Sequence, residues 1–346
     1  MTLRAEIVEQ PEVLERLLDA QWPAAQEVAA AIRRRAPAYA LIAARGTSGH
    51  AGLYAQYLWG AHNRLVVAHA APALVTAYAS APDMRAALVV GISQSGQSPD
   101  IVQTVAAGRA QGALTVAITN DPRSPLARTA EYVLDLGAGV EAAVAATKTY
   151  TTQLATVALL SAALSDAPAA RLEELRRVPD AVRVALAQEQ QIAALAGRYA
   201  EMERCILLGR GYSLATAREA ALKLKELASV AADPYSSAEF QHGPIALATP
   251  GTPVLAVAPQ DAVLDDMLPL LRRLTDEREA RLVVFSDSEA ALALADDPVR
   301  LPAGLPAWLG PLVQIIPLQL FAHALTIQKG FDPVAPRGLS KVTLTH

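Results

Sequence analysis

Short apolar runs alternate along this chain with longer segments in which apolar residues recur at helical spacing. In the first half the runs cover residues 41–44, 87–92 and 113–118. Uninterrupted runs of this length are typical of strands that are buried on both faces of a parallel sheet. Their alternation with helical segments predicts βαβ units, with helices packed on both faces of the sheet.

The same three runs recur in the second half of the chain. Their counterparts are residues 206–209, 253–258 and 280–285, so the offset stays at about 165 to 168 residues. A constant offset of one domain's length predicts an internal repeat. The predicted fold class is therefore α/β, with two doubly wound parallel-sheet domains in tandem.

The repeat also sets the expected domain boundaries. Charged, helical residues separate the two repeats, and another helical segment precedes the first. The expected parts are a helical arm at residues 1–35, a first domain at 36–170, a helical linker at 171–195, a second domain at 196–335 and a tail at 336–346.

Composition narrows the class of protein. The 346 residues are 52% hydrophobic and 18% charged, which is typical of a globular chain with a large core. A net charge of -4 and the absence of a basic run disfavour a nucleic-acid partner. The lone cysteine, Cys205, lies in an apolar run and is interpreted as a core residue.

No membrane partner is expected from the sequence. The first residues lack the apolar segment of a signal peptide. The most apolar helices, residues 154–164 and 312–327, are expected to be too short or too interrupted to cross a bilayer. The interruptions of the second are Pro317, Gln314, Gln319 and His323. A cytoplasmic protein is therefore expected, with surplus apolar surface for buried helices or an oligomer interface.

One polar loop stands out between a strand and a helix. Residues 93–98, Ser-Gln-Ser-Gly-Gln-Ser, follow an apolar run and precede a helical pattern that begins with Pro99. Ser98 suits the N-cap of that helix and Pro99 its first position. A helix N-terminus offers free N–H donors and a partial positive charge, which favour phosphate. The loop predicts a phosphate site; a plain serine-rich turn is the alternative.

The corresponding loop of the second half is different. It reads Pro259-Gln260-Asp261-Ala262, with no serine and an added acid. Loops that follow neighbouring strands gather beyond the carboxyl edge of such a sheet. In the first half, Gly46-Thr47-Ser48 occupies that position after the first strand. Phosphate binding is therefore assigned to the first half.

Candidate catalytic groups lie in the second half. Lys223 and Glu226 are three residues apart on a helix predicted over 214–230, so they share a face. A solvated ion pair is the alternative interpretation of this spacing. His242 lies in a polar loop and is followed by Gly-Pro, which gives it a defined position; an ordinary surface or core histidine is the alternative. The tail from Pro336 stays half apolar, which favours docking over fraying.

Seven segments of the chain, in register, resemble one enzyme family. They are Gly46-Thr47-Ser48, residues 93–98, 146–153, 208–211 and 221–226, Gln241-His242-Gly243-Pro244, and residues 336–341. Together they resemble the isomerase half of glucosamine-6-phosphate synthase, which is a tandem of two sugar-isomerase (SIS) domains with flavodoxin-like sheets. Each motif is weak alone, but the resemblance covers nearly the whole chain.

The resemblance implies a role for each matching residue. It implies that Thr47, Ser48, Ser93, Gln94, Ser95, Ser98 and Val144 bind the phosphorylated substrate. Glu226 matches the carboxylate that moves a proton between C1 and C2 of the open sugar, with Lys223 beside it. His242 matches a histidine that opens the ring and comes from the neighbouring subunit, so a homodimer with shared sites is implied. Lys341 matches a tail lysine that closes over the sugar. Neither a cofactor nor a metal is expected.

The chain departs from the family pattern at several positions. Ala146 replaces a serine, Arg45 replaces a small residue before Gly-Thr-Ser, and Gly338 replaces an asparagine of the tail. Thr2 stands where the synthase has the cysteine of its glutaminase domain, so no glutaminase activity is expected from these residues. These departures keep the residues of the predicted phosphate site and alter groups that the resemblance places near the sugar.

The expected activity is therefore that of a stand-alone enzyme. Conversion of glucosamine-6-phosphate and water to fructose-6-phosphate and ammonia is favoured. The alternatives are a galactosamine-6-phosphate deaminase/isomerase, a fructosamine-6-phosphate deglycase, a ketose–aldose isomerase, and a non-catalytic sugar-phosphate sensor.

Overall fold

The computed structural model describes residues 2–341, which form two compact units, each with one parallel sheet. The described part of the N-terminal unit consists of residues 9–141, 146–177 and 340–341. That of the C-terminal unit consists of residues 2–8, 142–145 and 178–339. Residues 342–346 of the predicted tail lie outside the described residues.

The N-terminal unit carries a five-stranded parallel sheet in the order β2-β1-β3-β4-β5. Its strands are β1 (Tyr39–Ala43), β2 (Val67–His69), β3 (Ala87–Ile92), β4 (Leu114–Thr119) and β5 (Tyr132–Asp135). Its helices are α2 (Gln10–Arg35), α3 (Gly46–Asn63), α4 (Ala73–Thr76), α5 (Pro99–Ala110), α6 (Pro125–Thr129), α7 (Lys148–Leu164) and α8 (Pro168–Leu175).

Alternate residues of the strands face opposite layers of helices. Val89 of β3 belongs to a buried cluster with Ile101 and Val105 of α5 and Leu126 of α6. On the other side, α7 packs against both α2 and α3. All six residues of β3 and all six of β4 are buried, because both faces of the sheet are covered.

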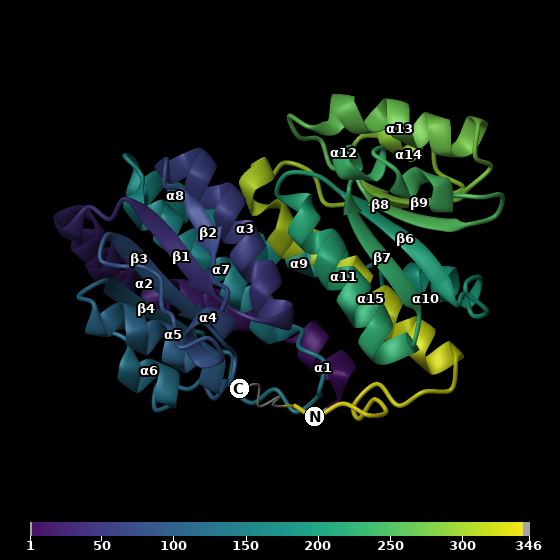
Figure 1. Cartoon of the computed structure of the whole chain (residues 1–346). Coiled ribbons are helices and arrows are strands. Elements are labelled where there is room, and N and C mark those ends of the chain that lie inside the picture. The colour runs from purple at the N-terminus through teal and green to yellow at the C-terminus, as the bar shows by residue number, and fades with distance from the viewer. Residues whose placement is uncertain (1, 342–346) are drawn as a thin grey trace. The chain divides into compact units, whose positions relative to one another are not determined.

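The C-terminal unit repeats this architecture. Its sheet order is β10-β9-β8-β6-β7. Counted from β7, its strands follow one another in the same chain order, 2-1-3-4-5, as those of the first sheet. Strands β6 to β9 are labelled in Figure 1. Its strands are β6 (Arg204–Gly209), β7 (Ala231–Ser236), β8 (Pro253–Val257), β9 (Arg281–Ser286) and β10 (Asp297–Arg300). The helices are α1 (Leu3–Val8), α9 (Val178–Leu186), α10 (Glu189–Gly197), α11 (Ser213–Ala228), α12 (Ser237–Phe240), α13 (Leu264–Asp276), α14 (Glu289–Leu292), α15 (Gly310–Gln328) and the 3₁₀ turns η1 (Pro244–Leu247) and η2 (Ala307–Leu309). The predicted tandem of doubly wound sheets is confirmed.

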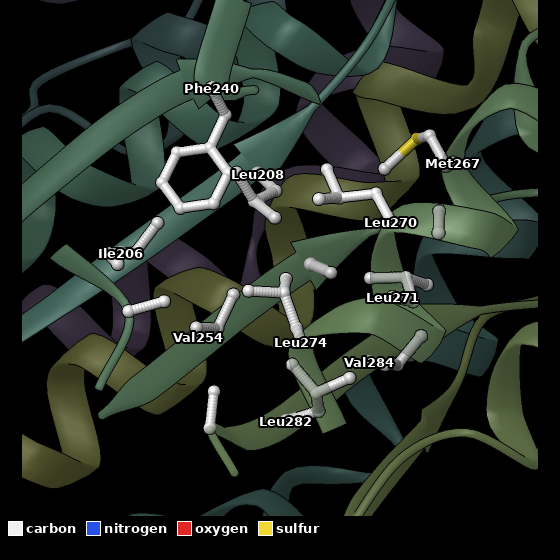
Figure 2. Close-up of a cluster of buried hydrophobic side chains, with 14 of the residues drawn as sticks. Ile206, Leu208, Phe240, Val254, Met267, Leu270, Leu271, Leu274, Leu282 and Val284 are labelled. Atoms are coloured by element: carbon white, nitrogen blue, oxygen red, sulfur yellow. The ribbon is translucent and has the colours of Figure 1, made fainter. Parts of the chain in front are cut away.

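One apolar cluster of the C-terminal unit shows how the pattern becomes a core. Figure 2 shows Leu270 and Leu274 of α13 beside Leu208 of β6 and Val254 of β8.

The interpretation of Cys205 as a core residue is also confirmed, since it is 3% exposed. Burial raises the pKa of its thiol to about 12.

The expectation that Pro317 interrupts the last apolar helix is wrong. Helix α15 continues through Pro317 and, with η2, forms a segment long and apolar enough to cross a membrane. However, 78% of its most apolar window is buried inside the structure, where it packs on α10 and α11. Burial, rather than interruption, makes this a core helix.

The two units divide the expected arm, linker and tail between them. In the arm, α1 groups with the C-terminal unit and α2 with the N-terminal unit. In the linker, the division falls between residues 177 and 178, and in the tail between residues 339 and 340. Residues before the first repeat and between the two repeats are helical, and each of these two segments contributes to both units.

The turn from β3 into α5 requires a glycine. Gly96 has φ +61°, and its carbonyl accepts the N–H of Leu126 at 3.1 Å. A Cβ at Gly96 would lie 2.2 Å from Oγ and 2.5 Å from Cβ of Ser124. Ser124 is the N-cap of α6, because its Oγ accepts the N–H of Ala127. The turn is therefore fitted closely against the start of α6.

We expect Gly96→Ala to destabilise the protein by about 3 kcal/mol, because left-handed backbone strain adds to a clash with Ser124. Gly112→Ala is the matched control, since Gly112 has φ +86° and no atom within 4 Å of an added Cβ. The control should lose only about 1 kcal/mol. Urea denaturation measures both, and equal losses would show that the fit against α6 is unimportant.

Candidate active site

The phosphate-binding residues predicted in the first half lie at one edge of the N-terminal sheet. Strands β1 and β3 are parallel neighbours, with Ala43 opposite Gly91. The loop that leads into α3 and the loop that leads into α5 therefore leave the sheet side by side. This carboxyl edge is where doubly wound sheets bind ligands.

The serine loop, residues 93–98, is held by its own hydrogen bonds. Oγ of Ser93 accepts the N–H of Gly96 at 3.1 Å, and Oγ of Ser95 accepts the N–H of Gln97 at 3.2 Å. The carbonyl of Gln94 accepts the N–H of Asn120 at 3.1 Å. Within residues 2–341, the hydroxyl protons of Ser93 and Ser95 find no acceptor, so both can donate to a bound anion.

Ser98 occupies the N-cap position as predicted, but its side chain does not cap the helix. Pro99 is at the first helical position, and no hydrogen bond joins the Ser98 side chain to α5. The physical reason is that Oδ1 of Asp100 accepts the N–H of Ile101 at 2.9 Å. Because that donor is already satisfied, capping by Ser98 is wrong as a prediction.

Ser48 is positioned by a buried residue of α7. Nε2 of Gln153 donates to Oγ of Ser48 at 3.0 Å, and both side chains are buried. Thr47, one residue earlier in the first turn of α3, is partly exposed.

The tail lysine meets a buried carboxylate of the N-terminal unit. Nζ of Lys341 donates to Oε2 of Glu141 at 2.7 Å. The carboxylate of Glu141 also accepts from the Thr149 hydroxyl at 2.7 Å, and from the backbone N–H groups of Thr147 and Thr149. Glu141 therefore anchors Lys341 against the start of α7.

In the C-terminal unit, Lys223 and Glu226 form an ion pair, but it is not a solvated one. Nζ of Lys223 lies 2.5 Å from Glu226 and 3.3 Å from Glu219. The side chains of Lys223 and Glu219 are 1% and 0% exposed, whereas that of Glu226 is 24% exposed. Burial alone would lower the pKa of Lys223, but the two carboxylates outweigh it and raise that pKa, so the ammonium is retained.

Glu226 lies on the wall of a cavity. The cavity has a volume of about 560 Å³, within the range of small-molecule sites. Its wall combines the end of α11 with residues after α15 and at the start of the tail, including Lys225, Glu226, Asp332 and Arg337. A carboxylate held by a buried ammonium, with its remaining surface toward a cavity, can act as a proton acceptor.

The other predicted site residues of this unit lie apart from that pair. His242 is in an exposed turn between α12 and η1, where its N–H donates to the Glu239 carbonyl at 3.0 Å. Among the described residues, no hydrogen bond or ion pair joins His242 to Glu226. Val144 is partly buried, and its N–H donates to the Val334 carbonyl at 3.2 Å.

The comparison with protein families is decisive at this point. The SIS domain model matches residues 37–163 and 198–328. The chain belongs to the SIS-domain family. The two matched segments correspond to the two sheets, and the resemblance predicted from the seven motifs is confirmed.

Several relatives of this SIS protein are known. Glutamine–fructose-6-phosphate aminotransferase (isomerizing) of Bordetella parapertussis is 38% identical over 312 residues, which cover 87% of this chain and 51% of that protein. The chain thus spans about half the length of such relatives. The C-terminal domain of glucosamine-fructose-6-phosphate aminotransferase from Francisella tularensis has a TM-score of 0.87 and 31% identity, over 96% of this chain and 98% of that one. Glucosamine-6-phosphate deaminase from Thermotoga maritima shares the fold over 100% of both chains, with a TM-score of 0.78 and 19% identity.

Sequence reasoning missed three residues that position this SIS protein's candidate site. Glu219 is four residues before Lys223, a spacing that places both on one helix face and was available as a signal. Gln153 lies within a motif that was recognised, but nothing local indicated its bond to Ser48. Glu141 is an isolated acid among small residues, 200 positions before Lys341, so no local pattern could join them.

We expect Lys223→Met to destabilise the protein by about 3 kcal/mol or more, because it leaves the carboxylate of Glu219 buried without its cation. Lys225→Met on the same helix is the control, since Lys225 is exposed, and it should change stability by less than about 0.5 kcal/mol. Thermal and urea denaturation of both variants measure the difference. Similar losses in the two variants would contradict a structural ion pair at Lys223.

Proposed function

We propose that this SIS protein converts glucosamine-6-phosphate and water to fructose-6-phosphate and ammonia. The observation that carries the proposal is the Glu226 carboxylate, which is held by the buried ammonium of Lys223 and borders a cavity. The serine loop of the first SIS domain supports a phosphorylated substrate. The relationship to the aminotransferases, which are named for a sugar 6-phosphate, supports the same substrate class.

In the proposed mechanism, Glu226 moves one proton between adjacent carbons. Its carboxylate removes the proton from C2 of the open-chain amino sugar and returns it to C1. As C1 is reduced to a hydroxymethyl group, O1 gains a proton and the C2 amine loses one, so that the amine becomes an imine. Water then adds to the imine carbon, and loss of ammonia leaves the C2 ketone. Lys223 orients the carboxylate and keeps its charge paired, so that one group can serve first as base and then as acid.

The remaining predicted residues take supporting roles in this proposal. Ser93 and Ser95 hold the phosphate through their hydroxyl protons, together with Ser48 and backbone N–H groups at the start of α5. His242 opens the sugar ring, and its exposed turn is suited to reach the site of a second subunit in a homodimer. Lys341 closes the tail over the sugar from its anchor on Glu141.

Ammonia release from a panel of substrates tests the proposed reaction. We expect release from glucosamine-6-phosphate, and little from galactosamine-6-phosphate or a fructosamine 6-phosphate.

Glu226→Gln should lower kcat for this ammonia release by about 10² to 10⁴ while KM changes little, since the substitution keeps the shape of the side chain and removes the base. Glu277→Gln, at an exposed ion pair after α13, is the control.

Each other outcome identifies a different reaction. Release from another member of the panel would identify that compound as the substrate. Exchange of the C1 protons of fructose-6-phosphate with solvent, without ammonia, would indicate a ketose–aldose isomerase. Binding of sugar phosphates with neither reaction would support a sensor.

The proposed exchange of His242 between subunits predicts complementation. Glu226→Gln and His242→Ala should each be inactive alone. In a mixed dimer, activity should return to at most one site, because two-fold symmetry places both substitutions in the other site. Activity of co-expressed, differently tagged chains measures this. A purified mixed dimer without activity would show that both residues act within one chain.

A further inference from the structure

Arg45 links the two loops at the carboxyl edge of the N-terminal sheet. It precedes α3 in extended backbone conformation, directly before Gly46-Thr47-Ser48. Its Nε donates to Oδ2 of Asp100 at 2.9 Å. Asp100 is the second residue of α5 and follows the serine loop by two positions. The Arg45 side chain thus reaches from one predicted phosphate loop to the end of the other.

The ion pair fixes the guanidinium and leaves most of its donors available. The Asp100 side chain is 2% exposed, whereas that of Arg45 is 54% exposed. A guanidinium has five N–H donors, of which Asp100 takes the one on Nε. Within residues 2–341, no partner is bound to Nη1 or Nη2 of Arg45. Its planar fork is therefore oriented on one side and open to solvent on the other.

The serine loop has no cation of its own, and a buried carboxylate lies close to it. Residues 93–98 contain no lysine or arginine, while the buried carboxylate of Asp100 follows them closely. Two other cations of this unit are already engaged, since Lys148 pairs with Glu9 at 2.5 Å and Lys341 with Glu141 at 2.7 Å. Without Arg45, a phosphate dianion in the loop would face a carboxylate that carries no cation.

We propose that Arg45 is a substrate-binding residue whose Nη1 and Nη2 groups donate to the phosphate held by the serine loop. The inference rests on the proposed function, because it assigns the phosphate of that substrate to this loop. A small side chain at position 45 makes no such contact. Arg45 therefore adds a charge-assisted contact to a loop that otherwise binds through hydroxyls and backbone N–H groups.

Binding of fructose 6-phosphate and of inorganic phosphate to purified protein tests the role of Arg45. Titration calorimetry on the wild type and on Arg45→Met should show a dissociation constant for fructose 6-phosphate that rises about 10- to 100-fold. Arg45→Lys should recover only part of the affinity, since it keeps the charge and loses the fork. Arg85→Met is the control, because Arg85 forms an exposed pair with Asp83 before β3 and loses the same charge.

Arg45 could strengthen phosphate binding by direct contact or only by cancelling the negative charge of Asp100. A double-mutant cycle separates these two effects. Asp100→Asn removes the carboxylate while its oxygen can still accept the N–H of Ile101. If Arg45 contacts the phosphate, Arg45→Met should still weaken binding at least about tenfold in the Asp100→Asn background. Equal affinities of the double variant and of Asp100→Asn alone would overturn the proposal, and so would unchanged affinity in Arg45→Met.

The same titrations distinguish this inference from the proposed function. A wild type that binds neither fructose 6-phosphate nor inorganic phosphate would contradict both. A wild type that binds them, with Arg45→Met indistinguishable from Arg85→Met, would contradict the role of Arg45 alone. A cooperative melting transition of each variant without ligand is the check that it is folded; Arg45→Met is expected to melt at a lower temperature, because it leaves the buried Asp100 carboxylate without its cation.

Discussion

The parallel pairing of all strands in both sheets is the constraint from which the rest of the structure follows. Because each strand runs in the same direction as its neighbours, every connection needs a helix that crosses one face of the sheet. Both faces are thereby covered, which explains why β3, β4 and most of β8 and β9 are buried. The same pairing delivers the loops after β1 and β3 to one edge of the N-terminal sheet.

Burying an ionised group in this apolar interior costs desolvation free energy. An ionised group that is removed from water needs a partner, or it gives up its charge. Several buried charges among the described residues follow that rule: Lys148 pairs with Glu9, Glu141 with Lys341, and Lys223 with both Glu219 and Glu226. In the last group, two carboxylates share one ammonium, and only Glu226 has exposed surface. The arrangement therefore leaves one partly solvated carboxylate in a fixed position.

The sequence predicted those features that depend on local pattern. Apolar runs located the strands, a constant offset located the repeat, and serine and glycine content located the loop between β3 and α5. Features that depend on distant pairing were not predictable in this way. The bond between Glu141 and Lys341, and the placement of α1 in the C-terminal unit, join positions that share no local signal.

Two local rules also gave wrong expectations, for physical reasons that the structure supplies. Ser98 has the residue type of an N-cap, but Asp100 satisfies the donor that a cap would bind. Pro317 has the residue type of a helix breaker, yet α15 continues through it. The surrounding burial of α15 against α10 and α11 stabilises the helix despite the lost hydrogen bond.

Two of the departures from the pattern that the resemblance implies, Arg45 and Ala146, lie in the first SIS domain, and a third, Gly338, lies in the tail. Arg45 and Ala146 alter the polar groups of the first SIS domain, where one guanidinium is gained and one hydroxyl is lost. The paired acid and base of α11 keep their spacing in the second domain. A proton shuttle tolerates little change, because its efficiency depends on the position and charge of one group. Substrate binding, in contrast, is shared among several side chains, so that one of them can be replaced while the others still bind. Under the proposed function, the departures at positions 45 and 146 therefore change contacts with the substrate, while Glu226, the group assigned to proton transfer, keeps its partner Lys223.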